Sequence, residues 1–306
     1  MKTTEFGKSG KIVPSIAVGC MRLNGIDEPA REKFIGTALD AGLYFFDHAD
    51  IYGRGECEEV FAKAVKGLGV SRDKMFLQSK CGIVPGKMFD FSKEHILSAV
   101  DGILKRLNTD YIDSLLLHRP DALVEPEEVA EAFDLLEKSG KVKHFGVSNM
   151  HPGQIELLKT CVKQELCADQ LQFSPVHASM ISAGTEVNMF TEGAVCRDGY
   201  ILDYCRLNKV TVQAWSPFQY GFFKGVYLNN PEFPELNRVI GELAEKYHLN
   251  AEGVVAAWIL RHPAQMQVIT GTMNVNRLLS IAAGADVTIT REEWYKVYIA
   301  AGHILP

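Results

Sequence analysis

Short apolar runs recur along the chain, and each of them ends in polar residues before an amphipathic stretch begins. We find eight such runs, at residues 16–21, 43–49, 75–80, 112–120, 142–149, 168–175, 210–217 and 266–271. Continuous apolar runs of this length are typical of strands that are buried on both faces, as in parallel sheets. The pattern therefore predicts eight buried, parallel strands.

The stretches between the runs have helical periodicity. In 127–141 the apolar positions are Val129, Ala132, Phe133 and Leu136, and in 95–107 they are Ile96, Val100, Ile103, Leu104 and Leu107. Both sets place apolar side chains on one face of a helix. Strands that alternate with helices indicate parallel crossovers, and eight such units favour a closed (β/α)8 TIM barrel over an open sheet.

Three segments lie outside this alternation. Residues 3–14 are predicted to form an N-terminal β-hairpin that turns between Gly7 and Gly10, ahead of the first barrel strand. Residues 176–200 and 217–234 are predicted to be longer loops. No linker or low-complexity stretch interrupts the chain, so we expect one domain over residues 1–306.

Composition narrows the classes of partner. The formal net charge is −6 with no basic cluster, which argues against nucleic acid and against an anionic membrane surface. The longest apolar stretch, 253–260, is far shorter than the ~20 residues that span a bilayer. The seven cysteines are irregularly spaced and form no C-x-x-C pair. We therefore expect a cytoplasmic protein that acts on a small molecule.

Polar residues at the carboxyl ends of the predicted strands are the candidate chemistry, because barrel active sites lie at that end. Asp47 ends the second run and Tyr52 follows it, Lys80 ends the third run, and His118 lies in the fourth. A lysine charge beside a tyrosine lowers the pKa of the phenol, and a buried lysine requires an anion such as Asp47. This set supplies a proton to a carbonyl group that His118 orients, so a reduction would need a hydride from a cofactor.

The remaining strand ends suit such a cofactor. Ser148, Asn149 and Gln170 can donate and accept hydrogen bonds, as a carboxamide requires, and Trp215 can stack on an aromatic ring. Gly271 and Thr272 follow the last run and precede a predicted helix that contains Arg277. A helix N-terminus with a nearby arginine favours phosphate.

Taken together, these motifs resemble the aldo-keto reductase family. The resemblance rests on DHADIYG, SKCG, LLLHRPD, SGKVKHFGVSN, DQLQFSP, QAWSP and GT…NRL, which occur in the family's order from about residue 5 to 290. The details of HADIYG, SKCG and HRPD are more similar to a bacterial oxidoreductase branch than to the aldose-reductase branch. The resemblance implies an NADPH-dependent (NADP+) oxidoreductase that reduces aldehydes or ketones to alcohols.

The resemblance also implies roles for individual residues. Asp47, Tyr52, Lys80 and His118 occupy the places of the family's catalytic tetrad, with Tyr52 as the general acid, Lys80 lowering its pKa, Asp47 holding Lys80 and His118 orienting the carbonyl. Ser148, Asn149 and Gln170 would hold the nicotinamide amide, Trp215 would stack on its ring, and Ser216 would meet the pyrophosphate. Gly271, Thr272 and Arg277 would face the adenosine end.

The chain departs from the family pattern near the expected cofactor. Trp215 replaces the usual stacking tyrosine, and Asn274 stands where a lysine often lies near the 2′-phosphate. Ser280 and Ile281 replace an acidic residue and an asparagine that read adenine. The expectation of NADPH over NADH therefore depends mainly on Arg277.

Other interpretations of the same residues remain open. A barrel lyase that forms a Schiff base on Lys80 is one alternative, and a cofactor-binding regulatory protein with slow turnover, like the family's channel subunits, is another. We expect no metal at His48 and Asp50, because no metal-ligand motif accompanies them, and we favour burial over reactivity for Cys81. The sequence leaves the carbonyl substrate and the oligomeric state undetermined.

Overall fold

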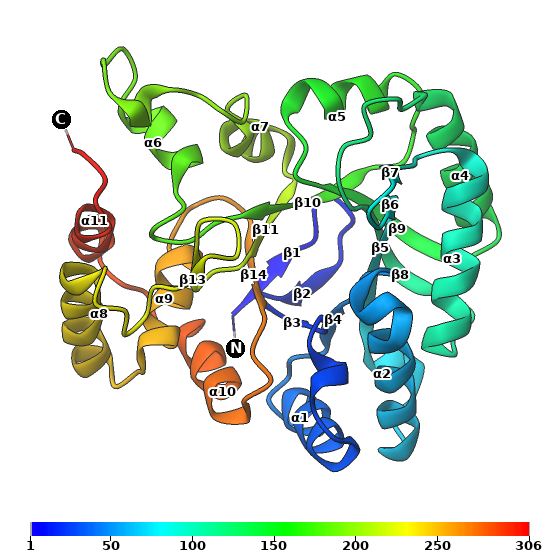
Figure 1. Cartoon of the computed structure of the whole chain (residues 1–306), viewed down its shortest axis with the longest axis horizontal. Helices are drawn as coiled ribbons and strands as arrows, with labels where there is room; N and C mark the ends of the chain where they lie inside the picture. The colour runs from blue at the N-terminus through cyan, green and yellow to red at the C-terminus, as the bar shows by residue number, and fades with distance from the viewer. Residues whose placement is uncertain (1, 306) are drawn as a thin grey trace.

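An N-terminal hairpin closes one end of a barrel in the structure, a computed structural model that describes residues 2–305. The hairpin pairs β1 (Thr3–Glu5) with β2 (Ile12–Pro14) and turns through two glycines with left-handed backbone, as predicted. The ring of Phe6 lies 5.9 Å from that of Phe45 and 5.2 Å from that of Phe76. Since Phe45 and Phe76 begin their strands, the hairpin covers the N-terminal end of the barrel (Figure 1).

Eight parallel strands form the closed barrel, which confirms the predicted fold class. Around the barrel their order is β10-β11-β14-β3-β4-β5-β8-β9, with every neighbouring pair parallel. Their bounds are β3 Ile16–Gly19, β4 Phe45–Asp47, β5 Phe76–Cys81, β8 Ile112–Leu117, β9 Val142–Ser148, β10 Leu166–Gln172, β11 Thr211–Trp215 and β14 Met266–Thr270. Each strand lies within or against one of the eight apolar runs, because only apolar side chains suit a strand enclosed by helices.

Helices surround the barrel (Figure 1). Their bounds are α1 Glu28–Asp40, α2 Glu56–Gly67, α3 Lys93–Leu107, α4 Pro126–Lys138, α5 Pro152–Lys159, α6 Ser179–Thr185, α7 Ile201–Asn208, α8 Pro234–Tyr247, α9 Ala251–Leu260, α10 Val275–Gly284 and α11 Arg291–Ala300. The predicted apolar stripes of α3 and α4 are their buried faces. No helix among residues 2–305 is long and apolar enough to cross a membrane.

The two predicted long loops contain regular structure. Residues 176–200 include α6 and a short 3-10 turn, η4 (Glu192–Ala194), and residues 217–234 include a small hairpin of β12 (Gln219–Tyr220) and β13 (Gly225–Val226). A similar small hairpin, β6 (Ile83–Val84) with β7 (Met88–Phe89), follows β5. The loop prediction was therefore wrong in part, because elements this short carry no detectable periodicity. The expectation of a single domain stays a prediction.

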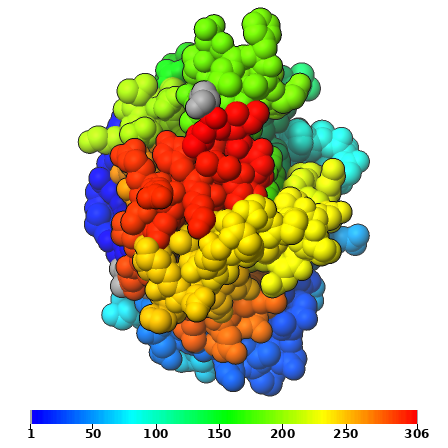
Figure 2. All heavy atoms as spheres, turned by 90° about the vertical axis from the view of Figure 1, so that its left-hand side faces the viewer, coloured from blue at the N-terminus to red at the C-terminus, as the bar shows by residue number. Residues whose placement is uncertain are grey.

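Helix α11 joins the barrel to the segment after β10. The hydroxyls of Ser182 and Tyr298 are 2.7 Å apart, and Nε2 of His303 is 2.7 Å from the carbonyl oxygen of Pro175. In Figure 2 the red C-terminal segment accordingly lies between the gold α8 and the green segment that contains α6. The indole of Trp294, in α11, stacks 4.8 Å from that of Trp258, in α9, and each donates to the other's backbone carbonyl. These two tryptophans are therefore fixed in the core.

Helix α9 is buried all round and approaches α10 closely. A Cβ on Gly284 would stand 2.1 Å from the carbonyl oxygen of Gly253, a backbone atom. A helix that is apolar on every side has no solvent face along which it can move away. The glycine pair therefore sets the spacing between α9 and α10.

We predict that Gly284→Ala lowers the free energy of unfolding by about 1–3 kcal/mol, because overpacking shifts backbone at this crossing. The matched control is Gly241→Ala in α8, where an added Cβ meets no atom within 4 Å. There the gain in helix propensity stabilises the protein by up to about 1 kcal/mol. Urea unfolding of both variants measures the difference, and equal free energies for the two would contradict the packing argument.

Candidate active site

Three adjacent strands carry the predicted tetrad to the C-terminal mouth of the barrel. Asp47 is the last residue of β4, Lys80 is the penultimate residue of β5, and His118 directly follows β8. Tyr52 begins a short 3-10 turn, η2 (Tyr52–Gly55), in the connection after β4. Because β4, β5 and β8 are hydrogen-bonded neighbours, the fold brings these four residues together.

Lys80 is fully buried, and all three of its ammonium hydrogens have partners. Its Nζ donates to Oδ2 of Asp47 at 2.8 Å, to the carbonyl oxygen of His48 at 2.7 Å and to the hydroxyl of Tyr52 at 3.1 Å. Burial by itself would lower the pKa of Lys80, but the charge of Asp47 and the hydrogen bonds to Asp47 and Tyr52 hold it above the ordinary value. Lys80 is therefore a fixed cation that touches the phenol.

The net pKa of Tyr52 lies above its ordinary value, whereas the sequence predicted a lowered one. Burial raises the pKa of the Tyr52 phenol, the charge of Lys80 lowers it, and the charge of Asp47 raises it again. Lys80 acts in the predicted direction, but desolvation of the phenolate is the larger effect. Tyr52 is therefore protonated at neutral pH and holds a proton that it can donate.

His118 faces Tyr52 across the site. Their ring centroids are 6.0 Å apart at 81°. Burial lowers the pKa of His118 well below its ordinary value, and the nearby charges of Lys80 and Arg119 lower it further. Nδ1 of His118 is buried without a hydrogen-bond partner among the described residues. Nδ1 is out of reach of solvent, so a neutral imidazole at this position would meet a polar ligand atom through its other ring nitrogen, Nε2.

A network of glutamines inside the barrel holds Asp47. Gln78 and Gln170 donate to Oδ1 of Asp47 at 2.7 and 3.1 Å, and both also donate to Oε1 of Gln213, at 2.8 and 3.1 Å. Gln213 donates to Gln267 at 2.8 Å, and Gln267 donates to the carbonyl of Pro14 at 2.7 Å. The barrel interior is thus polar from the mouth to the hairpin, which the sequence analysis missed.

The residues predicted to hold a carboxamide lie beside this network. Asn149 donates from Nδ2 to the hydroxyl of Ser148 at 2.7 Å, and its Oδ1 accepts from the indole of Trp215 at 3.1 Å. Asn149 has left-handed backbone, with φ 57°, which turns the chain at the end of β9. Gln170 is close by but bonds Asp47 and Gln213 through Nε2. The structure therefore brings Ser148, Asn149, Gln170 and Trp215 together at the mouth.

The residues predicted to meet phosphates lie on the neighbouring loops. Ser216 has φ 50°, and its hydroxyl donates to Oε1 of Gln219 at 2.8 Å. After β14, Thr272 accepts from the backbone of Asn274 at 3.1 Å, and Asn274 caps α10 by accepting from the backbone of Arg277 at 3.1 Å. The departure at Asn274 therefore has a structural role as the helix cap.

Two arginines lie near the residues predicted to face the adenosine end of the cofactor. Arg277 is 64% exposed and lies 3.3 Å from Glu252, so its charge is shared with a carboxylate. Arg22, which the sequence analysis missed, crosses from the loop after β3 and donates to the carbonyl of Gly271 at 2.7 Å. Its only sequence signal was a charge directly after an apolar run. A Cβ on Gly271 would stand 2.7 Å from Nη1 of Arg22, the end of an exposed and flexible side chain that would have to shift.

The residues set aside in the sequence analysis have buried environments. Burial lowers the pKa of His48 to about 3, and neither of its ring nitrogens has a hydrogen-bond partner among the described residues. Burial and Glu58 raise the pKa of Asp50 to about 7. No group of three or more metal-ligating side chains occurs within residues 2–305. Burial raises the pKa of the Cys81 thiol well above its ordinary value, so this thiol is inert rather than reactive.

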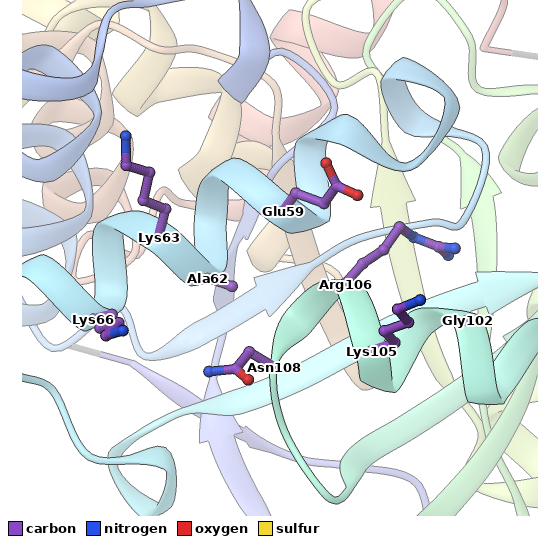
Figure 3. A pocket seen from close by; sticks show the side chains of 8 residues that line it. All are labelled: Glu59, Ala62, Lys63, Lys66, Gly102, Lys105, Arg106 and Asn108. Atoms are coloured by element: carbon purple, nitrogen blue, oxygen red, sulfur yellow. The ribbon is translucent and has the colours of Figure 1, made fainter.

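A surface hollow lies away from the barrel mouth, between α2 and α3 (Figure 3). Its charged lining residues are Glu59, Lys63, Lys66, Lys105 and Arg106. Lys63 pairs with Glu28 at 2.6 Å, and Arg106 pairs with the buried Glu58 at 2.7 Å. Its lining includes none of the tetrad, so it is not part of the site described above.

A (β/α)8 barrel with a lysine–aspartate pair against a tyrosine at its C-terminal mouth defines a barrel-enzyme site. The model of the Aldo/keto reductase family matches residues 15–300. The chain is 34% identical over 300 residues to the oxidoreductase YdhF of Escherichia coli, covering 94% of each chain. It is 33% identical over 277 residues to a 6-dehydroglucose reductase of Agrobacterium fabrum, covering 87% of this chain and 86% of that one.

Solved structures share the fold. An aldo-keto reductase from Klebsiella pneumoniae in complex with NADPH matches with a TM-score of 0.78 at 24% identity, covering 100% of this chain and 96% of that one. The chain belongs to the aldo/keto reductase family. This membership confirms the resemblance and the expectation of an NAD(P)H-dependent reductase in a family that uses NADP(H).

We predict that Lys80→Met lowers the free energy of unfolding by about 3–5 kcal/mol, because it leaves Asp47 buried without its cation. The control is Lys141→Met, which removes a cation from the exposed pair with Asp101 at 2.6 Å and should cost at most about 1 kcal/mol. Asp47→Asn added to Lys80→Met should recover part of the loss. Denaturant unfolding measures all three, and equal losses for the two single variants would contradict the ion-pair argument.

Proposed function

We propose that this protein reduces a small aldehyde or ketone to the alcohol with NADPH, and that Tyr52 donates the proton. The observation that carries the proposal is the contact of 3.1 Å between Lys80 Nζ and the Tyr52 hydroxyl at the barrel mouth. The contact places a permanent cation beside an oxygen that becomes negative when its proton leaves. Such preorganised charge is a major source of catalysis in sites that exclude water.

The proton moves from the Tyr52 hydroxyl to the carbonyl oxygen as that oxygen becomes an alkoxide. Burial keeps Tyr52 protonated beforehand, and Lys80 stabilises the tyrosinate afterwards. Asp47 keeps Lys80 charged and in place through the 2.8 Å ion pair. His118, neutral at physiological pH, donates a hydrogen bond that orients the carbonyl oxygen toward Tyr52.

The residues at the mouth fit a nicotinamide cofactor, which supplies the hydride when bound. Ser148 and Asn149 offer hydroxyl and amide groups beside Trp215, whose indole ring is held in place by its N–H bond to Asn149. Gln170 shares its amide with Asp47 and so joins the carboxamide site to the tetrad. Ser216 would meet the pyrophosphate, and Gly271, Thr272, Arg22 and Arg277 would lie toward the adenosine end.

The Schiff-base alternative fits less well. A lysine that attacks a carbonyl must be neutral, and amine nucleophiles in proteins have a lowered pKa. Lys80 has a raised pKa, and all its hydrogens are engaged. Borohydride in the presence of substrate should therefore trap no adduct on Lys80. Cytoplasmic localisation, a small carbonyl substrate and the absence of nucleic-acid and membrane partners stay predictions.

We predict that Tyr52→Phe lowers kcat for reduction of a neutral probe, 4-nitrobenzaldehyde, by about 10²- to 10⁴-fold, because the general acid is lost. Affinity for NADPH should be retained, since Tyr52 is not among the proposed cofactor contacts. Absorbance of NADPH at saturating cofactor measures turnover. Turnover that survives the substitution would exclude Tyr52 as the proton donor, and a wild-type protein that binds NADPH without turnover would favour a regulatory cofactor-binding role.

We further predict that Arg277 and Glu252 set the preference for NADPH over NADH. Arg277→Gln should weaken NADPH binding by about tenfold or more and leave NADH binding unchanged, because a charge-assisted bond to the 2′-phosphate is lost. Glu252→Gln should strengthen NADPH binding, since it removes a carboxylate 3.3 Å from Arg277.

Quenching of tryptophan fluorescence measures both affinities. Trp215 is the tryptophan at the mouth, while Trp258 and Trp294 are fixed in the core, so Trp215→Phe is the control for the signal. If Arg277→Gln weakens NADPH and NADH equally, Arg277 does not contact the 2′-phosphate.

A further inference from the structure

Arg119 is a cation at the barrel mouth that pairs with no anion among the described residues. It directly follows His118 and precedes Pro120, and its side chain is half-buried. Within residues 2–305 it forms no ion pair and donates no hydrogen bond. Arginine is rarely buried without a partner, because its charge loses water on burial. Its position beside the proposed catalytic groups therefore needs a reason.

The guanidinium reaches across the mouth toward aromatic rings. Its Cζ lies 5.7 Å from the ring centroid of Trp215 and 6.0 Å from that of Phe222. Arg119 follows β8, whereas Trp215 ends β11, and these strands are separated in the barrel by β9 and β10. Both distances lie within the range of a cation–π interaction, and no acceptor among the described residues takes a hydrogen bond from the guanidinium.

The charges around the proposed carbonyl site do not cancel. Lys80 is neutralised by Asp47 at 2.8 Å, and Tyr52 and His118 are neutral at physiological pH. Arg119 therefore adds one uncompensated positive charge beside them. Asp121, two residues further on, forms no ion pair with Arg119; its carboxylate accepts from the backbone of Phe91 at 2.9 Å and of Leu123 at 2.9 Å.

The cofactor is not the expected partner of this charge. The residues proposed for the phosphates, Ser216 and Gly271 to Arg277, lie after β11 and β14. Arg119 instead touches Trp215, which is proposed to lie against the nicotinamide ring. An anion that meets Arg119 therefore comes from the other molecule at the mouth, which is the substrate.

We propose that Arg119 binds an anionic group of the carbonyl substrate, so that the preferred substrates are aldehydes or ketones bearing a carboxylate or a phosphate. This proposal rests on the proposed reductase function and specifies its substrate class. The planar guanidinium fork forms paired hydrogen bonds with either anion. The exposed ring of Phe222, beside Arg119, offers an apolar surface to the carbon chain of the substrate.

The test compares matched aldehydes in wild type and variants. The carboxylate pair is 4-carboxybenzaldehyde with 4-methylbenzaldehyde, and the phosphate pair is glyceraldehyde 3-phosphate with glyceraldehyde. Wild type should have the higher kcat/KM for the charged member of at least one pair. Arg119→Gln should lower that charged-to-neutral ratio by about 10- to 100-fold, mainly through KM, because a hydrogen-bonded charge pair is lost. The pair with the larger fall identifies the anion.

Two further variants separate a specific contact from general charge. Arg119→Lys should retain part of the ratio, since it keeps the charge but loses the planar fork. Lys224→Gln removes an exposed cation from the loop that carries Phe222 and should leave the ratio unchanged. A ratio that is unaffected by Arg119→Gln, or that falls equally in Lys224→Gln, overturns the proposal.

Calorimetry distinguishes failure of this proposal from failure of the reductase function. NADPH should bind Arg119→Gln as it binds wild type, and a loss of NADPH affinity with an unchanged ratio would assign Arg119 to the cofactor. If wild type reduces none of the four aldehydes, the reductase proposal fails. The anion site is then tested alone by comparing the affinity of wild type for 4-(hydroxymethyl)benzoate with its affinity for 4-methylbenzyl alcohol. Preference for the benzoate that disappears in Arg119→Gln supports the site, and no preference overturns it.

Discussion

The buried ion pair between Lys80 and Asp47 is the interaction on which the site depends. Two charges of opposite sign lie 2.8 Å apart with almost no solvent exposure, and each charge makes the burial of the other tolerable. The pair also helps to keep Lys80 protonated: burial lowers its pKa, but the charge of Asp47 and the contacts with Asp47 and Tyr52 together outweigh the burial. Without the pair, the Tyr52 hydroxyl would lie beside a neutral amine, and a tyrosinate there would have no counter-charge.

Polar side chains inside the barrel hold this ion pair in place. Most barrel cores are filled by layers of apolar side chains, whereas here the glutamines at 78, 170, 213 and 267 form a hydrogen-bonded chain from Asp47 to the hairpin that covers the opposite end. The side chains of Gln78, Gln213 and Gln267 each donate and accept hydrogen bonds in this chain, and Gln170 donates to it. None of the four amides is buried without a partner among the described residues, so the polar interior is satisfied. Gln170 belongs to both this chain and the proposed carboxamide site, so a cofactor that bound to Gln170 would also act on the orientation of Asp47.

The sequence predicted the parts of the fold and site that depend on local pattern. The eight strands followed from apolar runs, and the meeting of Asp47, Lys80 and His118 followed from their places at strand ends. The glutamine chain was not predicted, because its members lie inside those runs and nothing local pairs residues more than a hundred positions apart. The net pKa of Tyr52 was misjudged for a similar reason: a neighbouring charge can be inferred from a motif, but the extent of desolvation depends on the packed loops. Arg119 follows His118 directly in the motif LLLHRPD, yet only the three-dimensional structure shows that its charge has no partner among the described residues.

The pH dependence of kcat/KM for a neutral aldehyde, at saturating NADPH, tests the central claim most directly. Tyr52 must be protonated to donate, and its pKa is raised, so the rate should stay level from neutral pH and fall only as the pH rises to about 10, the ordinary tyrosine value, or beyond. In Lys80→Met the remaining activity should fall at a still higher pH, because the cation that lowers the Tyr52 pKa is gone. A wild-type rate that falls with a midpoint near 7 would contradict the account and would point to another group, such as Asp50, as the source of the proton.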